Sequence, residues 1–158
     1  MKGFDKHGRR VMFFQVGNID PNQFKADDVY TLFYWMMEIL MDSLDQCSVT
    51  GFVTISNCKE ATMSHIGMFS NPVVAKKSTM TFQDAYPIRP KTMHLLNFPS
   101  IMEAVLNLVK SFMNDKMKQR MMIHSDEDLT KLVDLVGPDV LPEELGGTNG
   151  TLQDHAGM

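Results

Sequence analysis

The chain has 158 residues, of which 44% are apolar and 22% are charged, and its formal net charge is −4. This composition is typical of a globular protein that forms one domain with a buried core. The negative charge argues against a general nucleic-acid binder, and no segment approaches the roughly 20 consecutive apolar residues of a membrane span.

Two further features concern the cellular compartment. The amino terminus, Met1 to Gly8, is polar and has no apolar segment of a secretory signal, so a soluble cytoplasmic protein is expected. Cys47 and Cys58 are the two cysteines of the chain, too few for a disulfide framework, and we expect both to be reduced.

Short apolar runs alternate with helical patterns along the chain. The sequence predicts four strands, at 10–16, 52–56, 92–96 and 121–124. Between the first three strands it predicts a helix from Asp27 or Asp28 to about Gly51, and then two helices between Thr62 and Met80 that are separated at Asn71 and Pro72. A helix from Ser100 to about Lys118 follows the third strand, and a last helix begins at Ser125 with an acidic capping box and stops at Gly137. The tail from Gly146 is expected to fray. Alternating strands and helices favour an α/β fold with a mainly parallel sheet.

The helix predicted from Ser100 has more apolar surface than one core contact requires. Its apolar residues form two rows, and only Glu103, Asn107 and Lys110 make a narrow polar stripe. A surface helix needs a single apolar arc, so a second apolar environment is implied, which could be core, cavity, partner or membrane. The 15 methionines fit an adaptable apolar pocket, and they also fit an ordinary loose core.

Signatures of catalysis and metal binding are absent from the sequence. There is no nucleophile elbow, P-loop, dinucleotide-binding glycine motif, zinc-protease motif or Cys/His cluster with zinc spacing. We therefore expect no enzyme activity, no catalytic residue, no metal and no cofactor. A thiol enzyme that uses Cys47 or Cys58 with a distant histidine is a minor alternative.

Several short motifs occur in an order that resembles one known family. They are Asp5 to Val11 with Asp20-Pro21, His65 with Pro72 and Lys76-Lys77, Gln83 to Lys91 followed by His94 to Pro99, Lys116 to Arg120 with His124, and Leu141 to Gly147. This order is similar to that of the CRAL-TRIO lipid-binding domain, especially its tocopherol-transfer and retinaldehyde-binding branch. The resemblance covers about Asp5 to Gly147. We expect residues 1–147 to be the lipid-binding domain and 148–158 to be a disordered tail.

The resemblance implies a lipid cage with a sheet floor, helical walls and a mobile gate helix at about Phe98 to Lys116. Such a domain would hold one hydrophobic molecule, such as a tocopherol, a retinoid or a phospholipid, and carry it between membranes as a cytoplasmic monomer peripheral to them. The expected pocket and gate residues are Phe33, Met36, Leu40, Ile55, Phe98, Ile101, Met102, Val105, Leu106, Leu108, Val109 and Phe112. The family's phosphoinositide contacts correspond here to Arg89, Lys91, Lys116 and Arg120, with Lys118 as an addition.

The sequence also departs from the family pattern. The family usually carries a small helical domain before the lipid-binding part, whereas this sequence begins almost directly at the first predicted strand. We therefore expect that wall of the cage to be missing, and a truncated form or a fragment is an alternative. A membrane- or protein-interaction module of the same fold that does not transfer lipid is another. Asn57 and Glu60 stand where the family commonly has aspartate and glycine, so the turn after the second strand is expected to differ. Ser125, after the fourth predicted strand, likewise replaces a common glycine.

Overall fold

The computed structural model describes residues 1, 3–43, 49–124 and 129–156. At its centre is a 4-stranded sheet in the order β1-β2-β3-β4, in which every neighbouring pair is parallel. The strands are β1 (Arg10–Gln15), β2 (Phe52–Asn57), β3 (Pro90–Leu96) and β4 (Met121–His124). The α/β class and the parallel sheet that the sequence predicts are thus confirmed.

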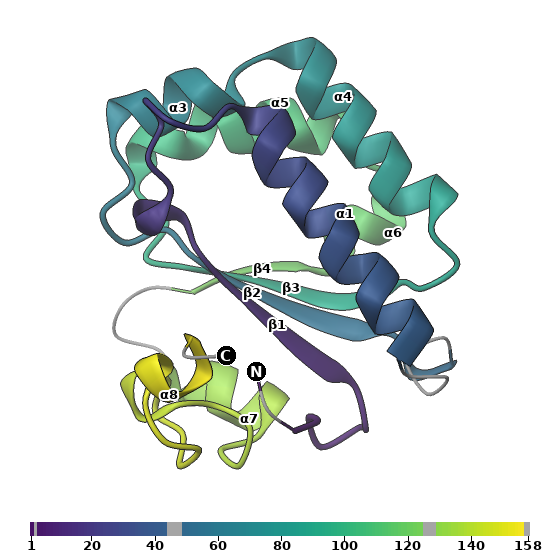
Figure 1. Ribbon diagram of the computed structural model, residues 1–158, viewed down its shortest axis with the longest axis vertical. Coiled ribbons are helices and arrows are strands. Elements are labelled where there is room, and N and C mark those ends of the chain that lie inside the picture. The colour runs from purple at the N-terminus through teal and green to yellow at the C-terminus, as the bar shows by residue number, and fades with distance from the viewer. Residues whose placement is uncertain (2, 44–48, 125–128, 157–158) are drawn as a thin grey trace.

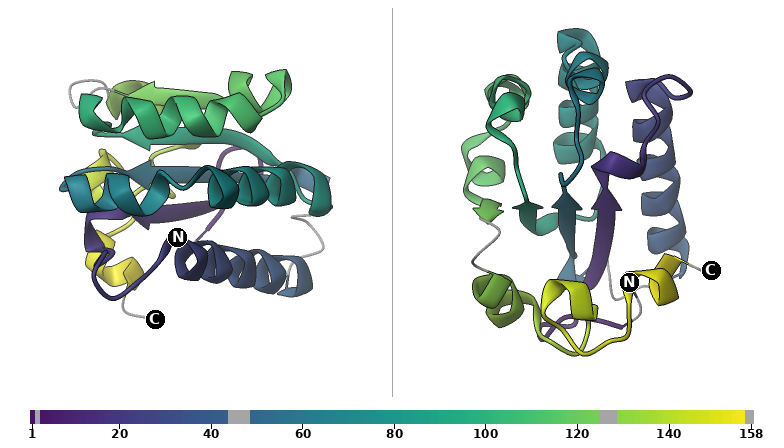
Figure 2. Two further views of the ribbon diagram at one scale, coloured as in Figure 1. Left: turned by 90° about the horizontal axis from the view of Figure 1, so that it is seen from above. Right: turned by 90° about the vertical axis from the view of Figure 1, so that its left-hand side faces the viewer.

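The helices cover the two faces of the sheet unequally (Figure 1). One face is covered by α1 (Ala26–Ser43), α3 (Met63–Phe69), α4 (Pro72–Met80), the π-helical turn η2 (Thr81–Ala85), α5 (Glu103–Phe112) and α6 (Asp115–Gln119). We call these elements the helical layer. The other face is covered by α7 (Leu129–Val136), by the 3₁₀ turn η4 (Glu143–Leu145) and by α8 (Leu152–Ala156). Figure 2 shows the same arrangement from above and from the side.

Local sequence explains where the helices of the helical layer begin. The side chain of Asn71 accepts hydrogen bonds from the backbone N–H groups of Val73 (3.0 Å) and Val74 (3.4 Å), and Pro72 occupies the first turn of α4. The Asn71-Pro72 break between two helices was predicted, and it is confirmed.

The helix predicted to run from Ser100 to about Lys118 is interrupted. A 3₁₀ turn at Ser100–Met102 precedes α5, which ends at Phe112, and the side chain of Asn114 then caps α6 by accepting from the N–H of Met117 at 2.9 Å. The capping interaction competes with a continuous helix, and the chain takes the capped alternative.

Three other predictions concern the ends of elements. The helix predicted to start with Asp27 or Asp28 as its cap begins earlier, at Ala26, so both aspartates lie in its first turn, where Asp28 accepts from the N–H of Lys25 at 2.8 Å. The course of the chain from 44 to 48 and the capping box predicted at 125–128 lie outside the described residues. The last predicted helix is present as α7, and Gly137 follows it at φ +108°, a conformation that favours glycine. The stretch expected to be a frayed tail contains α8, where Thr151 N–H donates to the carboxylate of Asp154 at 2.8 Å.

The turn after β2 shows how two departures from the family pattern are accommodated. Asn57 Oδ1 accepts from the N–H of Lys59 at 3.0 Å and from the amide of Asn97 at 2.8 Å, as a carboxylate would. Glu60 lies at φ +67°, in the left-handed region where glycine has no steric penalty. The turn therefore forms with an asparagine bridge and one strained glutamate.

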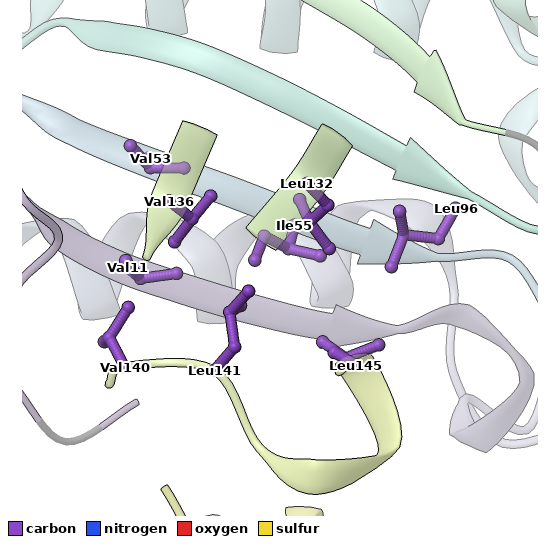
Figure 3. Close-up of a cluster of buried hydrophobic side chains, with 9 residues drawn as sticks. All are labelled: Val11, Val53, Ile55, Leu96, Leu132, Val136, Val140, Leu141 and Leu145. Carbon is purple, nitrogen blue, oxygen red and sulfur yellow. The ribbon is translucent and has the colours of Figure 1, made fainter. Parts of the chain in front are cut away.

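The core on the α7 side is compact. It consists of side chains from three strands, from α7 and from the segment after it: Val11, Val53, Ile55, Leu96, Leu132, Val136, Val140, Leu141 and Leu145 (Figure 3). Each of these side chains is at most 4% exposed, so this face of the sheet is fully packed against α7 and the segment after it. The helical layer packs against the opposite face.

Candidate functional site

The two faces of the sheet receive alternate residues of each strand. In β1, Val11 packs toward α7 whereas Met12 packs in a cluster with residues of α1. The same alternation puts Met93 under the helical layer and Leu96 in the α7-side core. The floor of any site beneath the helical layer is therefore formed by every second strand residue.

Aromatic rings fill the part of this layer between α1 and the sheet. The ring of Phe33 lies 5.5 Å from that of Phe14 and 5.3 Å from that of Phe82, and Phe82 in turn lies 5.9 Å from Phe52. Met37, at 0% exposure, packs in the same cluster. Contacts of this geometry stabilise each pair by roughly 0.5–1.5 kcal/mol beyond simple burial.

A methionine cluster occupies the neighbouring part of the layer. Met93, Met113 and Met117 are buried there, and the half-buried Val109 and Phe82 pack against them. Phe82 belongs to both clusters, so a continuous apolar layer runs from α1 to α6. Its methionine side chains are flexible enough to repack around different apolar shapes.

The predicted pocket and gate residues differ in where they pack and in how deeply they are buried. Phe33, Met36 and Leu40 pack in the aromatic cluster, and Val109 packs in the methionine cluster. Met102 and Val105 are buried, at 5% and 7% exposure. The half-buried members are Phe98, Leu106, Leu108 and Phe112, and Ile101 is 46% exposed. Ile55 does not lie with the others, because it points to the α7-side core (Figure 3).

Helix α5 does meet two apolar environments. The row of Met102, Leu106, Val109 and Met113 contributes Val109 and Met113 to the methionine cluster, while Phe112 of the other row lines an open groove between α4 and α5 of about 440 Å³. The α4 side of this groove is formed by Pro72, Val73, Lys76, Lys77 and Met80. A second open groove, of about 380 Å³, lies near Phe24 and Met68, and neither groove is lined by a strand residue.

The predicted basic residues gather near the amino-terminal ends of β3 and β4. Arg89, Lys91, Lys116 and Lys118 are exposed, whereas the Arg120 guanidinium donates to the Pro90 carbonyl at 2.8 Å. The backbone carbonyl of Arg120 also accepts from Met93 N–H at 2.8 Å, so this residue joins the two strands.

Lys118 has a partner of its own on α6. Its ammonium lies 3.6 Å from the carboxylate of Asp115, although both side chains are well exposed. Exposed pairs of this kind contribute little stability, but the carboxylate partly neutralises the Lys118 charge. Arg89, Lys91 and Lys116 therefore offer the more accessible positive charge.

A buried histidine pair on the α7 side of the sheet was not predicted. His94 Nδ1 lies 2.8 Å from His124 Nε2, and His94 Nε2 lies 3.1 Å from Thr92 Oγ1. Burial, followed by the charges of His124 and Arg9, lowers the pKa of His94 from 6.5 to about 4. The two histidines meet because the register between β3 and β4 places Leu96 opposite His124. The sequence does not reveal how two strands are aligned, so it could not predict this contact.

The described residues offer little chemistry for catalysis. Burial raises the pKa of the Cys58 thiol from 9.0 to about 11, which keeps it protonated at neutral pH. Within 1, 3–43, 49–124 and 129–156, no group of three or more His, Cys, Asp or Glu side chains could hold a metal ion. Among the same residues, no helix has the length and apolar character needed to cross a bilayer.

Comparison with known proteins covers nearly the whole chain. The alpha-tocopherol transfer protein-like proteins of Mus musculus and Homo sapiens are 30% identical over 148 residues, which are 94% of this chain and 42% of theirs. Clavesin-1 of Rattus norvegicus is 26% identical over 144 residues, which are 91% of this chain and 40% of its own length. The chain thus spans less than half the length of these curated relatives.

Structure and family comparisons agree with this result. A solved structure titled "Crystal structure of Sfh5" superposes with a TM-score of 0.74 at 19% identity, covering 97% of this chain and 54% of that one, which supports the fold. The CRAL/TRIO domain family matches residues 1–147, including the four strands and the helical layer. The chain belongs to the CRAL/TRIO domain family.

Proposed function

We propose that this domain binds one hydrophobic lipid molecule between the sheet and the helical layer and exchanges it at membrane surfaces. The observation that carries the proposal is the continuous apolar layer joined through Phe82, together with half-buried apolar side chains along α5. The family membership and the names of the tocopherol transfer protein-like relatives support the same ligand class.

In this proposal α5 is the movable cover. Val109 packs in the methionine cluster on one side of α5, and Phe112 lines the α4–α5 groove on the other, so a shift of α5 would keep its apolar side chains next to apolar surface. The groove would accept the second apolar row of α5, or an acyl chain, once the cover shifts. The flexible methionine side chains would let the layer repack around a bound lipid.

Exchange at a membrane follows from the cost of release into water. A ligand with ~15 buried methylene groups would lose about 12 kcal/mol on transfer to water, at ~0.8 kcal/mol per group. At a bilayer the ligand passes from one apolar phase to another, so most of this barrier disappears. Arg89, Lys91 and Lys116 would hold the domain against anionic head groups such as phosphoinositides, with about 1 kcal/mol from each.

A transfer assay tests the docking part of the proposal. Movement of a fluorescent lipid between donor and acceptor vesicles with anionic lipid should slow roughly a hundredfold in the variant that combines Arg89→Glu, Lys91→Glu and Lys116→Glu. Lys131→Glu, on the α7 side of the sheet, is the matched control and should transfer normally. Equal rates for the triple variant and the control would contradict docking through this surface.

A second pair of variants tests the binding site itself. Leu106 is half-buried on α5 and the adjacent Asn107 is exposed, so the same substitution can be placed on either side of one helix. Leu106→Glu should abolish uptake of the fluorescent lipid because a buried carboxylate is costly, and Asn107→Glu should preserve it. Equal uptake by both variants would exclude a ligand site beneath α5.

A further inference from the structure

Helix α1 presents an exposed apolar stripe on the side that faces away from the sheet. Leu32, Trp35 and Ile39 are 61%, 68% and 64% exposed, although α1 also contributes the buried Met37 to the core. The helix lies at one margin of the helical layer, beside the edge strand β1 (Figure 2). Three large apolar side chains with this exposure on one helix face indicate a contact surface.

The spacing of the stripe matches the seam of a two-helix contact. From Asp28 the residues Leu32, Trp35, Ile39 and Asp42 follow at alternating steps of four and three. This is the a/d spacing by which one helix receives the side chains of another between its own. The stripe therefore fits a second helix that packs along α1, with the apolar contact in the middle and a carboxylate at each end.

The charge of α1 decides which kind of partner fits. Ala26–Ser43 contains Asp27, Asp28, Glu38 and Asp42 but no lysine or arginine. An anionic membrane would be repelled by this face, and a second copy of the chain would bring like charges together. A helix with basic flanks would instead pair its charges with these carboxylates while its apolar face covers the stripe.

We infer that the outward face of α1 docks an amphipathic helix of a partner protein that carries an apolar seam flanked by lysine or arginine. This surface is separate from the basic residues near β3 and β4, so the domain can contact a membrane and a protein partner at the same time. The contact needs no lipid, and it stands independently of the transfer function proposed above.

Trp35 supplies a direct readout because it is the one tryptophan in the chain and lies in the middle of the stripe. The probe is a synthetic helix of about 18 residues with leucine at the a and d positions and lysine at e and g. A matched peptide carries glutamate in place of each lysine. The lysine peptide should shift Trp35 emission to shorter wavelength with saturation, and the glutamate peptide should bind at least ~10-fold more weakly.

Two variants of the domain sharpen the test. Leu32→Gln combined with Ile39→Gln should abolish the shift while the circular dichroism spectrum stays unchanged, since both side chains are exposed. Glu38→Lys combined with Asp42→Lys should reverse the preference, so that the glutamate peptide becomes the tighter ligand.

Four results would overturn the inference. They are no saturable shift with the lysine peptide, equal binding of the two peptides, a shift of Trp35 emission with anionic vesicles alone, and a shift on raising the protein concentration alone. The third result would mark the stripe as a membrane contact, and the fourth would mark it as an interface between copies of this chain.

Discussion

The buried histidine pair makes the stability of the domain depend on pH in a defined window. His94 is neutral in the folded state because its pKa is lowered from 6.5 to about 4, by burial first and then by His124 and Arg9. Below pH 6.5 His94 is protonated in the unfolded chain but stays neutral in the folded chain. The contribution of His94 to the free energy of unfolding therefore falls as the pH drops from 6.5 toward 4, and it is constant above pH 6.5. At about 1.4 kcal/mol per pKa unit, the full effect is up to about 3 kcal/mol.

Urea unfolding followed by far-ultraviolet circular dichroism measures this effect. Between pH ~7 and pH ~5 the free energy of unfolding should fall by about 2 kcal/mol in the unmodified chain. His94→Asn retains a hydrogen-bonding group near Nδ1 but cannot titrate, so it should be less stable at neutral pH and should lose most of this slope. His7→Asn is the control, because His7 is exposed. An unchanged slope in His94→Asn would refute the assignment.

Three further predictions concern stability and reactivity. Leu132→Ala should lower the free energy of unfolding by about 2–5 kcal/mol in urea titrations, because Leu132 is 0% exposed in the α7-side core; a loss below ~1 kcal/mol would contradict that packing. Glu60→Gly should raise the same free energy by up to about 1 kcal/mol by removing the strain at φ +67°, whereas Lys59→Gly next to it should lower it. Cys58 should react with iodoacetamide at pH ~8 at least ~100-fold more slowly in the folded chain than in urea, because its pKa is raised to about 11. Peptide mass spectrometry measures the two rates, and similar rates would show that the thiol is accessible in the folded chain.

The strands were predictable because they are short runs of apolar and β-branched residues between turn-forming residues. The run Phe52–Ser56 is rich in β-branched side chains between Gly51 and Asn57, and the strand is observed at Phe52–Asn57. Helix starts were equally readable where a capping side chain stands before a proline, as at Asn71. These signals are local, so they survive without knowledge of the tertiary structure.

The faces of the strands were not predictable. A parallel sheet covered on both sides has apolar residues pointing in both directions, so its strands carry no polar alternation that marks the pocket side. Ile55 was therefore expected in the pocket, yet it packs in the α7-side core. The His94–His124 contact escaped prediction for a related reason, since it depends on the register between β3 and β4.

The break between α5 and α6 marks another limit of local patterns. Apolar spacing continues past Phe112 to Met117, so periodicity alone predicts one helix. Asn114 nevertheless stops it, because its side chain satisfies the N–H of Met117 in place of the helical backbone. The apolar excess of α5 was readable, and its two environments agree with that expectation, but which one meets a ligand is still a proposal.

Native mass spectrometry of the gently purified domain tests the central claim most directly. A lipid carrier should retain one apolar molecule for each chain, and organic extraction should release a lipid that accounts for the added mass. Leu106→Glu should appear at the mass of the bare chain, and Asn107→Glu should keep the adduct. A bare mass for the unmodified domain, even after incubation with lipid vesicles, would contradict the account.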